Sequence, residues 1–446
     1  MGGTTHPGRD AGHATETLKK SMTDQDDSYQ KSTLPNGIRV VTERIAHVRS
    51  VSLGLWVGIG SAHEDGAQRG ISHVIEHMLF KGTPSRSARA IAELMDSIGG
   101  NLNAFTDKEA TCYHARVVDV HAPLALEVLS DMFLHSLFDP AELAKEKQVI
   151  LEEIRMYDDS PDDINQDLFL RSVWSGSPLG EPIIGYAETV SSITPELIRA
   201  YIANRYTPAS VIVTAAGNVD HDAFAADVAR LLGGMRSGVT VPDAATPHFH
   251  PVRVVRHKDS EQAYLMLGVE GTSSSDERRY PLSVLDAIVG GGMASRLFQE
   301  IREKRGLVYS VYSMHNAYRP GGTFAVSAAT RPGNAAEVTA LVRAELASVA
   351  ASGVTAEEIA RAKEHLKGGL LLALESTNTR MMRLGRSELN VGRHIPAAEV
   401  AARIEAVTKP EIDALAASMF GKAGMALTVV GPVEDDFDAG VLAESA

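Results

Sequence analysis

Two stretches decide the fold: ITPELIRAYIANRYTPASVIVTAAGNV at residues 193–219 and VTKPEIDALAASMFGKAGMALTVVGPV at residues 407–433. Each predicts a threonine that starts an amphipathic helix, then a turn, an apolar strand and Gly-x-Val. Thr194 aligns with Thr408 and Gly217 aligns with Gly431, so that both pairs stand 214 residues apart. A register shared over the whole stretch indicates that the chain contains an internal duplication.

The beginning of each half supports the duplication more loosely. EQAYLMLGVEGTSSSDERRYPLSVLDAIV at 261–289 mirrors VRSVSLGLWVGIGSAHEDGAQRGISHVIEH at 48–77, but it lacks the His and Glu cluster of the first copy. We therefore predict an α+β fold of two homologous half-domains, each a mostly antiparallel sheet packed with helices. The predicted divisions are a disordered polar tail at 1–32, a first domain at 33–235, a linker rich in Gly, Pro, Ser and Thr at 236–250, a second domain without the cluster at 251–434, and a tail at 435–446.

The first half carries clear signals of single elements. Asn36-Gly37 between apolar alternations predicts a hairpin. Helical periodicity and strand alternation predict further elements, namely helices near 72–81, 87–98, 121–135 and 141–157 and strands at 100–106 and 110–118.

Composition narrows the classes of function. The chain has 446 residues, 44% of them hydrophobic, which is ample for two or three domains. Its net charge of -14 argues against non-specific binding to nucleic acid or anionic lipid, although the charge is equally explained by solubility alone. We expect a cytoplasmic protein with neither nucleic acid nor membrane as partner, because no apolar signal core, transit pattern or long apolar run is present.

A group of metal-binding residue types stands out in SHVIEHMLFKG at 72–82. On a helix, His73 and His77 are one turn apart on the same face, and Glu76 lies only about 60° from His73. Two such imidazoles can bind one cation while the glutamate reaches a water on it, as in the His-x-x-Glu-His pattern of zinc hydrolases. A chance cluster or a structural pair of hydrogen-bonded histidines are the other interpretations. The single Cys112 excludes a cysteine cluster.

The helix predicted at 141–157 offers a third ligand, which a catalytic zinc ordinarily needs. Glu146 and Glu153 share the face of Leu143 and Ile150, whereas Glu152 points the opposite way. A carboxylate on an apolar stripe is costly unless a cation or hydrogen bond compensates it. We assign Glu153 as the third ligand and Glu146 as a group that orients a metal-binding histidine. The alternative is that both carboxylates pair with an Arg or Lys.

These residues resemble the pitrilysin and insulinase type of zinc metallopeptidase, in the short-chain branch that includes mitochondrial processing peptidase. The family has His-x-x-Glu-His and a third glutamate about 76 residues later, which here is Glu153, with an acidic residue seven positions earlier, which here is Glu146. The resemblance extends from about Leu34 to Val433. It implies one Zn²⁺ per chain.

The resemblance implies further site residues. Asn103, Ala104, Phe105 and Thr106 match the family's edge strand, to which an extended substrate adds as another strand. Arg302 and Tyr309 match an arginine and a tyrosine that reach the substrate near the metal. From the residues alone, a surface arginine and a core tyrosine are the default interpretation.

The implied function is zinc-dependent endopeptidase or oligopeptidase activity on peptides or unfolded segments. Glu76 would be the general base, with Tyr309 and Arg302 gripping the developing oxyanion or a neighbouring carbonyl. In the family two such chains, or one chain of twice the length, form a clamshell chamber, so this chain would be one half of it. A homodimer is expected, and a heterodimer with an inactive homologue is the variant. The competing interpretation is a catalytically silent scaffold or partner subunit of the same fold.

Overall fold

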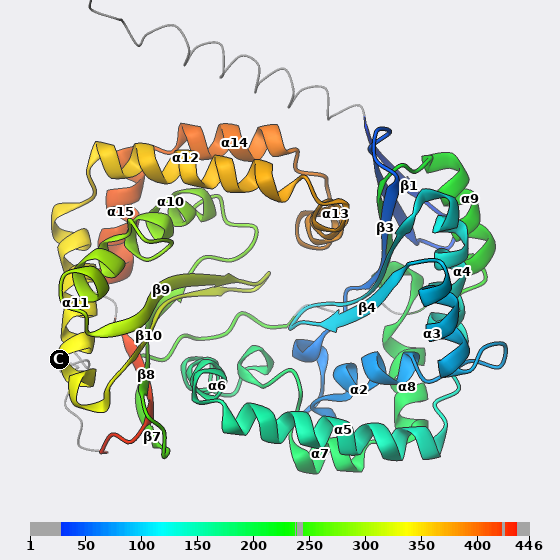
Figure 1. The fold of residues 1–446 in the computed structure, drawn as a ribbon, viewed down its shortest axis with the longest axis horizontal. Helices are drawn as coiled ribbons and strands as arrows, with labels where there is room; N and C mark the ends of the chain where they lie inside the picture. Colours follow the sequence, from blue (N-terminus) through cyan, green and yellow to red (C-terminus); the bar gives the residue numbers. More distant parts are fainter. Residues whose placement is uncertain (1–27, 237, 239–243, 422–423, 435–446) are drawn as a thin grey trace, which may run out of the picture.

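The computed structural model describes residues 28–236, 238, 244–421 and 424–434 (Figure 1). The predicted tails fall outside it at 1–27 and 435–446, as does the predicted linker at 237 and 239–243. The strands of the first sheet are β1 (Tyr29–Thr33), β2 (Arg39–Arg44), β3 (Ser50–Val57), β4 (Asn101–Thr106), β5 (Thr111–Val118) and β6 (Val211–Gly217). The strands of the second sheet are β7 (Arg253–His257), β8 (Ala263–Gly271), β9 (Val308–Ala317), β10 (Gly322–Thr330) and β11 (Ala426–Gly431).

The helices are divided between the two halves. The first half contributes α2 (Ile71–Leu79), α3 (Ala88–Ser97), α4 (Ala122–His135), α5 (Pro140–Asp159), α6 (Pro161–Val173), α7 (Ala187–Ser192), α8 (Pro195–Arg205) and α9 (His221–Leu232). The second half contributes α10 (Arg279–Val289), the π-helix η7 (Phe298–Glu303), α11 (Ala335–Ser352), α12 (Ala356–Ala373), α13 (Thr377–Val391), α14 (Ala397–Ala406) and α15 (Lys409–Phe420).

The two sheets repeat one topology. Strands β2-β6-β3-β5-β4 in the first sheet have the same order and directions as β7-β11-β8-β10-β9 in the second. In both sheets one pair is parallel, β2 with β6 and β7 with β11, and the other neighbours are antiparallel. The helix and strand of the repeated stretch are α8 and β6 in one half and α15 and β11 in the other. The prediction of two homologous, mostly antiparallel half-domains is confirmed.

The sixth strand of the first sheet, β1, corrects the sequence analysis. Residues 29–32 were expected in the disordered tail, but they pair with β2 across a turn at Asn36-Gly37, where Gly37 has φ of +101°. The segment Tyr29-Gln-Lys-Ser-Thr is polar because β1 is an edge strand, exposed along part of its length. Composition alone therefore gave the wrong state for these four residues.

Each half lends a helix to the sheet of the other half. Helix α13 packs on β2, β3 and β6, where Met381 and Leu384 join a buried cluster with Trp56. Helix α6 packs on β8 and β11 through Phe169. Figure 1 shows α13 beside β3 and α6 close to β8. This exchange fixes the two half-domains to one another.

The contact between α13 and the first sheet needs a glycine. A Cβ on Gly385 would lie 2.2 Å from Cε2 of the Trp56 ring, which is far inside van der Waals contact. Since Trp56 is fully buried, the ring has no free space into which it can move. Gly385 therefore sets how closely the second half approaches the first.

None of the described helices is by itself long and apolar enough to cross a bilayer. The segments Pro332–Ser352 and Ala356–Ala373 together have the length and apolar composition of a span, but the chain bends by 110° between them.

Candidate metal centre and peptide cavity

Three ligand groups from two helices converge at one point. The ligand atoms of His73 and His77 on α2 and of Glu153 on α5 all lie within 4.8 Å of one another. Oε2 of Glu153 is 3.9 Å from Nε2 of His73 and 3.7 Å from Nε2 of His77. A tetrahedral zinc with ligands at roughly 2.0–2.2 Å separates neighbouring ligand atoms by about 3.3–3.6 Å, so the residues present fit this ion.

Glu146 lies on the other side of the second histidine. Its Oε2 is 3.1 Å from Nδ1 of His77 and its Oε1 is 2.7 Å from Nζ of Lys81. An ionised carboxylate only accepts hydrogen bonds, so Nδ1 of His77 donates and Nε2 keeps a lone pair directed at the metal position. Pairing with an Arg or Lys is the alternative role that the sequence leaves open for Glu146 and Glu153, and Glu146 does form such an ion pair, with Lys81. It does not replace the histidine contact.

Burial favours the metal-binding form of the first histidine. Burial, together with the neighbouring His77, lowers the pKa of His73 to about 4, which keeps its imidazole neutral near pH 7. Neutral imidazole is the form that binds a metal ion. Nδ1 of His73 is buried and has no hydrogen-bond partner among the described residues.

Glu76 is held beside the ligands by the edge strand. The hydroxyl of Thr106, at the end of β4, donates a 2.6 Å hydrogen bond to Oε2 of Glu76. Burial raises the pKa of Glu76 above its usual range, while the Thr106 hydroxyl and His77 act in the opposite direction. The Thr106 hydroxyl thus fixes Oε2 of Glu76, and the Glu76 side chain lines the cavity beside the ligands.

A cavity of about 580 Å³ opens in front of this cluster. Its walls come from both halves of the chain, namely His73, Glu76, Ala104, Phe105, Thr106, Lys108, Glu153, Tyr157, Gln166, Asp167, Leu170, Ile183, Ile184, Asn316 and Tyr318. Strand β4 pairs only with β5 among the described strands, so one of its edges is not covered by a sheet neighbour. Asn103 is absent from the lining, and its Oδ1 accepts from the N–H of Ala104 at 2.8 Å.

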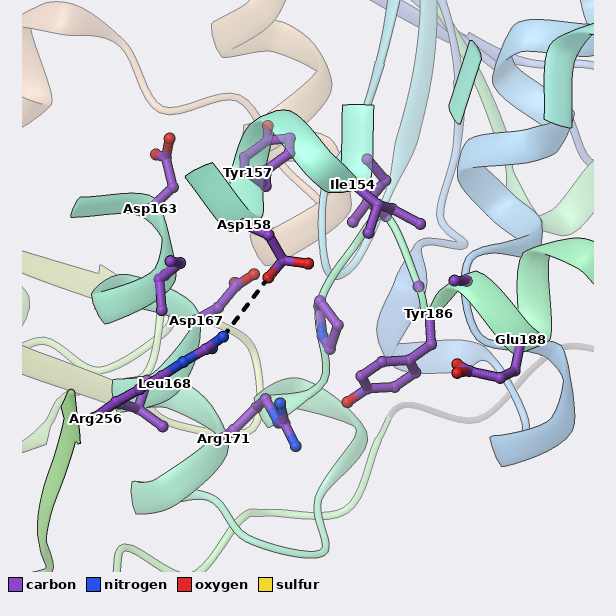
Figure 2. Close-up of a pocket in the computed structure, with 15 residues that line it drawn as sticks. Ile154, Tyr157, Asp158, Asp163, Asp167, Leu168, Arg171, Tyr186, Glu188 and Arg256 are labelled. Carbon is purple, nitrogen blue, oxygen red and sulfur yellow. Dashed lines mark ion pairs between the residues drawn. The ribbon is translucent and has the colours of Figure 1, made fainter. Parts of the chain in front are cut away.

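A smaller, charged cavity of about 280 Å³ adjoins the first (Figure 2). Tyr157, Asp167 and Ile184 line both cavities. The remaining charged residues that line the smaller cavity are the acids Asp158, Asp163 and Glu188 and the bases Arg171 and Arg256. Figure 2 shows Arg256 directed at Asp158, with 4.0 Å between Nη2 and Oδ1. Four acids against two arginines give this second cavity an acidic balance.

Arg302 and Tyr309 contact each other, and neither residue belongs to the lining of either cavity. The guanidinium carbon of Arg302 is 5.2 Å from the centre of the Tyr309 ring and 4.8 Å from that of Phe298. Neither Arg302 nor Tyr309 lines the cavity of its own chain, and Tyr309 is 77% exposed. Arg302 belongs to the π-helix η7, a rare conformation found frequently at functional sites.

The structure adds cavity residues that the sequence analysis did not single out. The most notable is Lys108, which is 4% exposed and whose Nζ donates to the carbonyl of Glu181. Burial lowers the pKa of Lys108, and the nearby Asp167 carboxylate opposes that effect. Asp163 and Asp167 stand four apart on α6, a spacing that marks one helix face and was available in the sequence.

Comparison with known proteins agrees with this geometry. The family model described as insulinase (peptidase family M16) matches residues 39–186, and the one described as peptidase M16 inactive domain matches residues 192–366. The chain is 43% identical to the uncharacterized zinc protease YmxG of Bacillus subtilis over 403 residues, which cover 90% of this chain and 98% of the relative. It is 41% identical to an uncharacterized zinc protease of Streptomyces coelicolor over 416 residues, covering 92% and 90%.

Solved structures share the fold. A peptidase M16 inactive domain from Pseudomonas fluorescens superimposes with a TM-score of 0.85 at 21% identity, covering 91% of this chain and 98% of that one. A protease from Helicobacter pylori superimposes with a TM-score of 0.84 at 20% identity, covering 90% and 99%. The similarity to the curated relatives spans nine tenths of the chain and includes both ligand helices. The chain therefore belongs to the insulinase family of peptidases, family M16.

Proposed function

We propose that the protein is a zinc-dependent endopeptidase or oligopeptidase of the inverted His-x-x-Glu-His type that cleaves peptides or unfolded segments. The observation that carries the proposal is the convergence of His73, His77 and Glu153 beside Glu76, in a cavity walled by an edge strand. Zinc held there supplies a Lewis acid that polarises the scissile carbonyl and lowers the pKa of water. The relatives from Bacillus and Streptomyces are named zinc proteases, which supports zinc as the metal.

The side chains of this chain bind the substrate, transfer the proton and orient a ligand. An extended peptide adds to the uncovered edge of β4 at Ala104, Phe105 and Thr106 and so presents its backbone to the cluster. Glu76, positioned by the Thr106 hydroxyl, accepts the proton of the attacking water and later passes it to the leaving amine. Glu146 keeps the Nδ1 proton of His77 in place throughout.

The proposed assembly is a homodimer that forms a closed chamber. Arg302 and Tyr309 contact each other, neither lines the cavity of its own chain, and Tyr309 is largely exposed. In a dimer with the two halves facing each other, this pair serves the metal centre of the second copy. There Tyr309 donates to the developing oxyanion, a contribution whose loss ordinarily costs about 10²–10³-fold in kcat.

Mixing two inactive variants tests the dimer and the peptidase activity together. Glu76→Gln and Tyr309→Phe are each expected to lose most cleavage of a quenched fluorescent peptide. The two variants are combined in equal amounts and allowed to exchange subunits without being unfolded. Half of the dimers then contain one chain of each variant, and one of the two sites in such a dimer has both Glu76 and the Tyr309 of the other chain. About a quarter of the wild-type activity should therefore return. Sedimentation should show a dimer. If the protein is a dimer but the mixture is as inactive as each variant alone, Tyr309 of one chain does not act at the metal centre of the other chain.

The acidic second cavity supports a preference for basic side chains beside the scissile bond. Changing Asp163 to Asn should lower kcat/KM for a peptide with arginine at that position about 10–100-fold, because a charge-assisted hydrogen bond is lost. The matched peptide with neutral citrulline should be cleaved as before. Asp162→Asn, on the same helix but outside the lining, is the control. If the ratio of kcat/KM for the arginine peptide to kcat/KM for the citrulline peptide is the same in Asp163→Asn as in the wild type, the proposed preference for basic side chains is wrong.

A further inference from the structure

The helix that carries both histidine ligands begins without a cap of its own. The residue before α2, Gly70, has φ of +91° and no side chain, and the first turn contains no acidic residue. The first N–H groups of a helix have no partner within it and must be satisfied from outside. His73 lies in this first turn, so any looseness there moves a metal ligand.

Glu64 supplies the missing partner from outside the helix. Its Oε2 accepts from the N–H of Gly70 at 2.7 Å and its Oε1 accepts from the N–H of Ser72 at 2.8 Å. The side chain is 3% exposed, and its carboxylate stands at the positive end of the α2 dipole. Burial raises the pKa of Glu64 to about 7 against the effect of these two N–H groups. Both carboxylate oxygens are thus committed to the start of the ligand helix.

The backbone beside Glu64 is fixed to the turn that follows the edge strand. The N–H of Ser61 donates to the carbonyl of Asp107 at 3.1 Å, and that of Ala62 donates to the carbonyl of Lys108 at 2.8 Å. A Cβ on Gly60 would lie 2.2 Å from the same Asp107 carbonyl oxygen, so the two segments are in close contact. The turn at 107–110 continues β4, which carries Thr106 and its hydrogen bond to Glu76.

These contacts connect three parts of the site in series. The Glu64 carboxylate holds the helix start that places His73, while the backbone of Ser61 and Ala62, just before Glu64, is bound to the turn that continues the strand holding Glu76. We infer that Glu64 is a positioning residue of the metal centre, which fixes the first turn of α2 and thereby the distance from His73 to His77 and Glu153. This inference rests on the proposed zinc site.

The test measures metal binding rather than cleavage alone. Glu64→Gln keeps the shape but turns an NH₂ group towards one of the two N–H donors, so one cap bond is lost. We expect the affinity for Zn²⁺ and Co²⁺, measured by competition with a chromophoric chelator, to fall about 10–100-fold. The visible spectrum of the Co²⁺ protein should change, since it reports the ligand geometry. Peptide kcat should fall while KM stays, because the β4 edge is unaltered.

Two further variants separate positioning from ordinary helix capping. Asp220 caps α9 in the same half-domain, where its Oδ1 accepts from the N–H of Ala223 at 3.0 Å. Asp220→Ala should lower the Tm as Glu64→Gln does, but leave metal affinity and the Co²⁺ spectrum unchanged. Glu64→Asp, which keeps the charge on a shorter arm, should restore part of the affinity.

The outcomes that overturn the inference are distinct from those that overturn the proposed function. A Glu64→Gln protein with lower Tm but wild-type affinity and Co²⁺ spectrum would make Glu64 a structural cap only. Wild-type protein that binds neither Zn²⁺ nor Co²⁺ would overturn the proposed zinc site, and this inference with it. Wild-type protein that binds both metals but cleaves no peptide would overturn the peptidase proposal while leaving the Glu64 comparison intact.

Discussion

Glu76→Gln should reduce kcat/KM for a quenched fluorescent peptide by at least about 10²–10⁴-fold and leave one Zn²⁺ bound per chain. Glutamine keeps the hydrogen bond from the Thr106 hydroxyl to the side-chain oxygen, so the local structure is expected to stay. What is lost is the carboxylate oxygen that accepts a proton from the attacking water. Zinc content by elemental analysis and initial cleavage rates, measured on the same preparation, check both halves of the expectation.

Glu152→Gln is the matched control for this experiment. Glu152 stands next to the ligand Glu153 but its side chain is 63% exposed and pairs with Arg155 on the surface. Its replacement should change neither zinc content nor cleavage. Undiminished cleavage by Glu76→Gln would contradict the assignment of the general base. Zinc in the wild type without any cleavage would favour the competing scaffold subunit.

Helical periodicity explains why much of the site could be predicted from the sequence. His73 and His77 on one turn, and Glu146 and Glu153 on the buried face of a helix, follow from the angle per residue alone. The structure accordingly has Leu143, Glu146 and Ile150 buried and Glu152 exposed. What periodicity cannot supply is which two helices meet, and there the resemblance to the family added the spacing between α2 and α5.

The remaining features depend on tertiary contacts that leave no periodic signal. Glu64 lies in a connection of short 3₁₀ turns, and it reaches α2 only because that connection is bound to the turn after β4. The sequence predicted this helix near residues 72–81, whereas α2 spans Ile71–Leu79. Likewise Arg302 on η7 contacts Tyr309 on β9, and a contact between two different elements leaves no periodic pattern in the sequence.

The second large effect is expected at the metal itself. Removing a residue that hydrogen-bonds a metal ligand typically weakens metal binding about 10–100-fold. Glu153→Ala should weaken Zn²⁺ binding by more than this, because it removes a charged ligand itself. Glu146→Gln should fall within that smaller range, since His77 remains and only the acceptor for its Nδ1 proton is weakened. Glu142→Gln on the same helix, paired with Lys145 at the surface, should bind zinc as the wild type does.

The order of the Zn²⁺ affinities of these three variants tells which glutamate is a ligand, which orients a ligand and which has no part in metal binding. Competition against a chromophoric chelator at fixed pH gives each dissociation constant without reference to cleavage. If Glu146→Gln lost as much affinity as Glu153→Ala, the two carboxylates would have to be equivalent ligands, which conflicts with Glu146 contacting the far nitrogen of His77. If Glu153→Ala bound zinc normally, the convergence of the three ligand atoms would not be a metal site. The expected order therefore depends on one arrangement: two imidazoles on one short helix facing a carboxylate on another, with the second carboxylate behind them.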